Sequence, residues 1–148
     1  MPVTAATPSL DTIRESFEFF DDWQDRYRFI IDLGKQLPAL PDALKVDANL
    51  VRGCQSQVWI DYAEHDGRLQ FRIDSDALIV RGLIAIVLAA FDNRPAAEIL
   101  AYDIDGLFAE LDLLRHLSPT RGNGLAALVR RIKTIASSTN GSSDRAMT

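Results

Sequence analysis

The stretch NLVRGCQSQVW, residues 49–59, contains Cys54, the single cysteine among the 148 residues of the chain. A cysteine thiolate can attack an electrophile, exchange sulfur with another sulfur compound or bind a metal. A lone thiol cannot form an internal disulfide, a CxxC redox pair, a multi-cysteine zinc site or a four-thiolate iron–sulfur site within one chain. Sulfur chemistry at Cys54 therefore requires a sulfur atom supplied by another molecule.

The neighbours of Cys54 leave open whether the thiol reacts or only packs. A free cysteine often behaves as a small buried hydrophobe. Gly53, however, permits a tight or positive-φ backbone that would project the next side chain outward. Gln55, Ser56 and Gln57 offer hydrogen-bonding groups in place of apolar packing. The local sequence is compatible with both an inert and a presented thiol.

A reactive thiol needs a group that stabilises its thiolate. Arg52 lies two residues away, and Arg121 would serve if the fold brings it close, since a nearby cation lowers a thiol pKa. A Cys–His dyad would need His65 or His116. His65 falls in a predicted turn, where we expect it to be solvated, and His116 follows a helix, where we expect it to interact with terminal carbonyls. A cysteine hydrolase is therefore disfavoured.

Composition and charge narrow the class of protein further. The chain is 47% hydrophobic and 25% charged, as in an ordinary single soluble domain. Its net charge of -5 argues against nucleic acid and anionic membranes as partners. The longest apolar run, residues 82–91, is too short to span a bilayer, and the first residues lack the pattern of a signal peptide. Together with a lone free thiol, these features predict a cytoplasmic protein without membrane contact.

The first half of the chain predicts two helices followed by a hairpin. Ser9 and Asp22 are suited to cap the helices, and Gly34 with the prolines after it is expected to end the second one. From residue 56 the apolar residues alternate, as in a strand with one buried face. The Asp-Gly pair in HDGR, residues 65–68, is typical of a tight hairpin turn, so the pattern predicts an antiparallel hairpin there.

The second half predicts a helical layer on this hairpin. Residues 74–76, DSD, are expected to begin a buried helix that reaches about Phe91, with the carboxylates at its positive end. Short helices follow near 95–101 and 105–114, then a loop RHLSPTRGNG, and then a final amphipathic helix whose basic residues are expected near its end. The predicted fold is α+β, with a small antiparallel β-sheet packed against several helices.

The chain is predicted to form one domain over residues 1–137. The first eight residues are expected to be frayed, since they are small and include proline. The polar tail over 138–148 has little apolar surface to bury and is expected to be disordered.

Four segments of the chain resemble one known family. VRGCQSQVW resembles the signature of the SufE family of cysteine desulfurase-associated sulfur-acceptor proteins. RYRFIIDLGKQLPALP (26–41), SDALIVRGLIAIVLAAFDN (75–93) and RHLSPTRGNGL (115–125) resemble further segments of that family in the same order. The resemblance covers residues 10–137, and Arg52 departs from the family pattern.

The resemblance implies a fold similar to SufE and to the NifU-like iron–sulfur scaffold proteins. It implies a sulfurtransferase-like carrier that takes persulfide sulfur from a cysteine desulfurase of the SufS or a related type onto Cys54. This carrier would stimulate the desulfurase and pass the sulfur to an iron–sulfur scaffold or another thiol acceptor. It would hold a transient persulfide but no cofactor or metal of its own, because the pyridoxal phosphate belongs to the partner.

The same resemblance assigns roles around the thiol. Gly53, Gln55, Ser56 and Gln57 would shape a loop that can hold the sulfur sheltered and swing it out. His116, Arg121 and Asp76 would be supporting residues, and Arg52 is a further candidate because of its charge. Two alternatives remain beside the carrier: a non-catalytic module that docks on the desulfurase, and a single-cysteine thiol redox protein.

Overall fold

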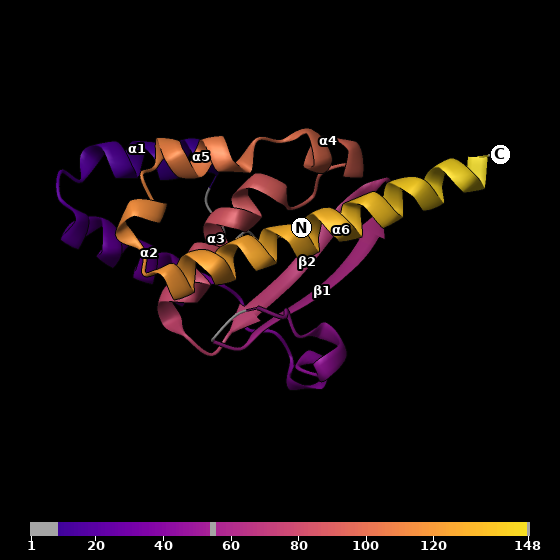
Figure 1. Cartoon of the computed structure of the whole chain (residues 1–148), viewed down its shortest axis with the longest axis horizontal. Helices are drawn as coiled ribbons and strands as arrows, with labels where there is room; N and C mark the ends of the chain where they lie inside the picture. Colours follow the sequence, from indigo (N-terminus) through magenta and orange to yellow (C-terminus); the bar gives the residue numbers. More distant parts are fainter. Residues whose placement is uncertain (1–8, 54–55, 148) are drawn as a thin grey trace.

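The computed structural model describes residues 9–53 and 56–147, with side chains described as far as residue 139 (Figure 1). Within these ranges the fold is α+β, as predicted: six α-helices accompany a two-stranded antiparallel sheet. The elements are α1 (Leu10–Phe19), α2 (Trp23–Gln36), β1 (Val58–His65), β2 (Arg68–Ser75), α3 (Leu78–Phe91), α4 (Ala96–Ala101), α5 (Ile104–Glu110) and α6 (Pro119–Met147), with single 3-10 turns η1 (Asp42–Leu44), η2 (Asp47–Asn49) and η3 (Leu114–His116).

The hairpin has the predicted strands and turn, but the predicted alternation of buried residues fails in β1, where Val58, Trp59 and Ile60 are all buried and Tyr62 is exposed. β1 and β2 pair from Val58 opposite Ser75 to His65 opposite Arg68. Asp66 and Gly67 both have positive φ, 53° and 76°, which two-residue hairpin turns require and which Asp-Gly tolerates well. The apolar residues that β2 buries against the helical layer are Leu69, Phe71 and Ile73.

Helix α3 is the centre of the core and contacts α1, α2, β2 and α6 (Figure 1). It begins at Leu78, two residues later than predicted, with Ala77 as its N-cap. Gly34 was expected to end α2, but this helix continues to Gln36 and buries Gly34 against α3. A Cβ at Gly34 would lie 2.6 Å from the Leu78 carbonyl oxygen. This glycine is therefore needed for close helix packing and does not end the helix.

Helix α6 is longer than the sequence predicts. The segment expected to be a loop up to residue 124 is helical from Pro119, because Ser118 caps this end: the Arg121 amide donates to Ser118 Oγ at 3.3 Å. At its other end α6 continues to Met147, through the tail for which disorder was expected. None of the helices in the described ranges is long and apolar enough to cross a membrane.

Four cations occupy a recurring position at the ends of helical elements. The last carbonyls of a helix lack partners within it, and a cationic side chain can satisfy them. The pairs are Arg26 with Phe17 and Phe20 at the end of α1, Arg81 with Gly34 and Leu37 at the end of α2, Lys133 with Leu100 and Tyr102 at the end of α4, and Arg131 with Ala48 and Leu50 at the end of η2. Arg131 and Lys133, which the sequence placed near the end of their own helix, instead hold the ends of other elements.

Candidate functional site

Cys54 and Gln55 lie outside the described residues, so the site is defined by the residues on either side. The Val51 amide donates a hydrogen bond of 2.7 Å to the Val58 carbonyl. Leu50 and Trp59 form an antiparallel bridge just outside that bond. These two pairs, Val51 with Val58 and Leu50 with Trp59, form the stem of the cysteine loop at the start of β1.

Gly53 has a positive φ of 92°, which is one of the backbone conformations that its residue type permits. A Cβ at this position would also lie 3.3 Å from the Cβ of Ala127 in α6. Any other residue here would combine backbone strain with a tight contact. The glycine thus brings the loop backbone next to α6 one residue before Cys54.

Asp76 fixes the other side of the loop. The Gln57 amide donates to Asp76 Oδ1 at 3.1 Å, and the Asp76 amide donates to the Gln57 carbonyl at 3.3 Å. This reciprocal pair joins the last residue of the loop to the turn that precedes α3. Asp76 was also expected to serve the start of α3, but its carboxylate is directed to the loop, and the Ala77 amide is capped by Ser75 Oγ.

A cavity of about 270 Å³ opens beside the loop. Apolar residues of β1, α3 and α6 line it, together with four polar residues: Ser56, Ser118, Thr120 and Arg121. Ser56 comes from the loop two residues after Cys54, and Arg121 comes from the first turn of α6. The structure therefore brings Arg121 to the same cavity as the loop, as its candidate role requires.

His116 is engaged elsewhere. Its ring stacks on Trp23 of α2 with the centroids 4.0 Å apart, and its Nε2 lies 3.4 Å from Asp112 Oδ2. Its carbonyl accepts a hydrogen bond from the Tyr27 hydroxyl. His116 is not among the residues that line the cavity. His65, the other histidine, lies exposed at the hairpin turn beside Asp66, so the described contacts give neither histidine a place at the cavity.

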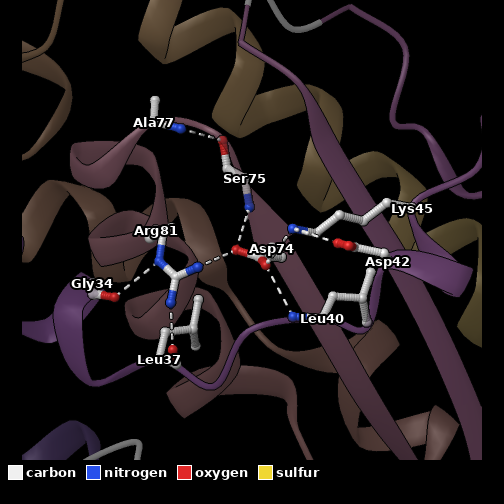
Figure 2. A network of polar contacts seen from close by, with 9 residues as sticks. All are labelled: Gly34, Leu37, Leu40, Asp42, Lys45, Asp74, Ser75, Ala77 and Arg81. Carbon is white, nitrogen blue, oxygen red and sulfur yellow. Dashed lines mark hydrogen bonds and ion pairs between the residues drawn. The ribbon is translucent and has the colours of Figure 1, made fainter.

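Asp74 is the centre of a buried polar network that sequence reasoning missed (Figure 2). Its side chain is only 1% exposed. The carboxylate accepts hydrogen bonds from the amides of Leu40 and Ser75, at 2.9 and 2.8 Å, and forms ion pairs with Arg81 and Lys45. The sequence suggested a helix cap, because nothing local reveals that partners 34 and 29 residues earlier converge on this carboxylate.

The network joins the chain segment that leads into the loop to β2 and α3. Arg81 continues from Asp74 to the carbonyls of Gly34 and Leu37, as Figure 2 shows. Lys45 lies between Asp74 and the ring of Trp59, with Nζ 5.4 Å from the ring centroid. Since Trp59 belongs to the stem of the loop, the network also supports that stem.

Among the described residues, no group of three or more His, Cys, Asp or Glu side chains is arranged to hold a metal ion. The described residues around the loop can support thiolate chemistry, because Asp76 fixes Gln57 and the adjacent cavity has both apolar and polar walls, with Arg121 among the lining residues. Fold and site together define a class of small α+β proteins in which a cysteine-bearing loop precedes a β-hairpin covered by helices.

Comparison with known proteins specifies that class. The SufE domain, described as an Fe-S metabolism associated domain, matches residues 11–136, and the chain belongs to the SufE family. It is 48% identical over 132 residues to an uncharacterized SufE-like protein of Rhizobium meliloti (strain 1021), covering 86% of this chain and 94% of the relative. It is 44% identical over 127 residues to the sulfur acceptor protein CsdE of Escherichia coli (strain K12), covering 85% and 86%.

A solved structure has the same fold. The solution structure of a hypothetical protein from Thermus thermophilus superposes with a TM-score of 0.70 at 16% sequence identity. The match covers 89% of this chain and 96% of the other. At this identity the likeness extends to the fold alone.

Proposed function

We propose that this protein accepts sulfur on Cys54 from a cysteine desulfurase and passes it on for iron–sulfur cluster assembly. Membership of a family associated with Fe-S metabolism and the likeness to a protein named a sulfur acceptor support this role. The observation that carries it is the arrangement of the described residues on either side of the single cysteine: Val51 pairs with Val58, and Ser56 lines a cavity together with Arg121.

The proposed transfer is a thiol–persulfide exchange. The thiolate of Cys54 attacks the outer sulfur of a persulfide on the desulfurase cysteine, a new S–S bond forms at Cys54, and the old S–S bond breaks. The partner's cysteine leaves as a thiolate, so no external oxidant or reductant is consumed. Because the chain has no second cysteine, the sulfur on Cys54 cannot be released by an internal disulfide and passes to another molecule.

The surroundings of the loop suit a reactive sulfur. A persulfide is readily oxidised or reduced, so a partly enclosed site preserves it during transfer. The cavity offers apolar walls from α3 and α6 together with the guanidinium-bearing Arg121. A cation at this position favours the thiolate and the anionic persulfide over their protonated forms. Arg52, exposed next to Gly53, is a second candidate for the same effect.

The partners follow from this chemistry. The donor would be a cysteine desulfurase of the SufS or a related type, which carries the pyridoxal phosphate that releases sulfur from cysteine. The recipient would be an iron–sulfur scaffold or another protein thiol. The proposed carrier acts in the cytoplasm, where a free thiol stays reduced.

The proposal is tested by desulfurase turnover. Alanine release from L-cysteine is measured with the desulfurase alone, with the protein, and with Cys54→Ser. The wild-type protein is expected to stimulate turnover, and Cys54→Ser is expected to lose most of that stimulation because the enzyme persulfide then has no acceptor. Full stimulation by Cys54→Ser would instead favour the docking module. A thiol redox protein would leave turnover unchanged and form a sulfenic acid with peroxide.

A further inference from the structure

The 3-10 turn η2 directly precedes the stem of the cysteine loop and has too few internal contacts to be stable alone. It comprises three residues, Asp47–Asn49, and buries none of them. A single 3-10 turn has poor hydrogen-bond geometry and little stability of its own. Its position must therefore be fixed by contacts with the rest of the fold.

Arg131 of α6 supplies such contacts. Its guanidinium donates to the Ala48 carbonyl at 3.2 Å and to the Leu50 carbonyl at 3.4 Å. Leu50 belongs to the stem, because it bridges Trp59 and precedes Val51, whose amide closes the loop. A planar guanidinium can hold two carbonyls at once in a fixed geometry. Among the described residues, Arg131 forms no ion pair with a carboxylate, and its guanidinium donates to these two carbonyls.

Ala127 extends the contact between α6 and the loop. It lies four residues before Arg131, so the two side chains share one face of the helix. Gly53 passes Ala127 closely enough that a Cβ on the glycine would lie 3.3 Å away. One face of α6 thus meets the chain at residues 48–50 and again at Gly53, immediately before the thiol-bearing residue. Arg26, Arg81 and Lys133 also donate to carbonyls at helix ends, but the helices they contact are longer than η2 and bury residues of their own.

We propose that Arg131 is a positioning residue for the Cys54 loop. It holds the stem of the loop on α6 from one side, while Lys45 and the Asp74 network hold the preceding segment from the other. Removing the guanidinium loosens the stem. Small reagents then reach the thiol more often, whereas a protein-bound persulfide, which must meet the thiol in one geometry, is attacked less efficiently. The second consequence rests on the proposed function; the first does not.

The test uses the single thiol as its own reporter. Iodoacetamide alkylation of Cys54, followed by intact mass, is timed for the wild-type protein, Arg131→Gln, Arg131→Lys and the control Arg130→Gln. Arg130 is exposed on the adjacent position of α6, so its substitution makes the same charge change away from the stem. Rates are compared at a pH above which the wild-type rate no longer rises, so that the thiolate fraction does not enter.

Arg131→Gln is expected to react about threefold to tenfold faster than the wild type, since two charge-assisted hydrogen bonds are lost. The alkylation rate of Arg131→Lys should lie between those of Arg131→Gln and the wild type, because an ammonium can reach one carbonyl at a time. Arg130→Gln should match the wild type. In the desulfurase assay, Arg131→Gln should raise the KM for the carrier more than it lowers kcat.

Equal alkylation rates for Arg131→Gln and the wild type would overturn the positioning role, as would equal acceleration by Arg130→Gln. Circular dichroism establishes that each variant is folded, and if Arg131→Gln is not, Arg131→Lys decides by its expected intermediate acceleration. Alkylation requires no desulfurase, so it tests the role of Arg131 independently. Absence of sulfur uptake by the wild type would refute the proposed function without affecting the alkylation result for Arg131.

Discussion

Gly82 in α3 lies directly against the main chain of Ile30 in α2. A Cβ on Gly82 would be 2.6 Å from Ile30 Cγ2 and 2.7 Å from the Ile30 carbonyl carbon. Real side chains do not approach this closely, so the two helices can cross here only with glycine. This crossing brings the end of α2 within reach of Arg81, which begins the network that supports the cysteine loop.

Gly82→Ala is therefore expected to destabilise the protein. Forcing a methyl group between two packed helices costs about 1–3 kcal/mol or more of unfolding free energy. The matched control is Gly122→Ala in α6, where the new Cβ would meet only Leu114 Cδ2 at 3.9 Å. There alanine should stabilise by up to about 1 kcal/mol through its helix propensity. Urea unfolding measures the change in unfolding free energy for both variants. Changes of the same sign would contradict the requirement for glycine at the crossing.

Asp74→Asn is expected to lower the free energy of unfolding far more than an equivalent change at the surface. It leaves the Arg81 guanidinium, whose side chain is only 18% exposed, without its carboxylate, and removing one partner of a buried ion pair costs about 3–5 kcal/mol. Asp61→Asn removes the carboxylate from a more open pair with Arg72, 2.7 Å long, and should cost about 1 kcal/mol or less. Denaturant unfolding of the two variants tests this, and similar losses in both would refute the central role of Asp74.

Asp92 makes stability depend on pH in a defined direction. Burial raises the pKa of its carboxyl, and the hydrogen bonds from the amides of Phe71 and Asn93 offset this only in part. The folded state therefore holds the proton more tightly than the unfolded state. The contribution of Asp92 to stability falls as pH rises from the ordinary aspartate range, about 4, through the raised folded pKa, and is constant above it.

Asp92→Asn removes this penalty while keeping an oxygen that can accept from the Phe71 amide. The unfolding free energy of the variant relative to the wild type should therefore increase between acidic and neutral pH and then level off. Thermal or urea unfolding across that range provides the measurement. A difference that stays flat, or that shrinks as pH rises, would show that burial does not govern this carboxyl.

Arg121→Gln is expected to slow the reaction of the thiol at neutral pH. A guanidinium at the cavity favours a thiolate over a thiol, so the pH of half-maximal alkylation should move upward in the variant. Arg115→Gln is the control, because Arg115 is exposed on η3 and pairs with Asp112. An unchanged pH profile for Arg121→Gln would leave Arg52 as the remaining candidate.

Features determined by neighbouring residues could be predicted from the sequence. The caps at Ser9 and Asp22 each involve an amide three residues later, and both are present. The hairpin follows from alternation and from an Asp-Gly turn, which are also local signals. The positive φ of Gly53 is among the conformations that the residue type permits, although the sequence did not single it out.

Features determined by residues far away in the sequence could not be predicted from it. Gly34 has the residue type of a helix end, but its surroundings come from α3, more than 40 residues later. The glycines at 122 and 124 suggested a loop, whereas the Ser-Pro start and the packing of α6 make the segment helical. Asp74 and Arg131 act on segments 29 residues or more away, so their roles became visible only in the fold.

The measurement that tests the central claim most directly is the intact mass of the protein after incubation with a cysteine desulfurase and L-cysteine. The wild-type protein is predicted to gain the mass of one sulfur atom and to lose it on treatment with dithiothreitol. The Cys54→Ala variant is predicted to gain no mass. An unchanged wild-type mass beside an active desulfurase, or an equal gain by Cys54→Ala, would contradict the assignment of Cys54 as the sulfur acceptor.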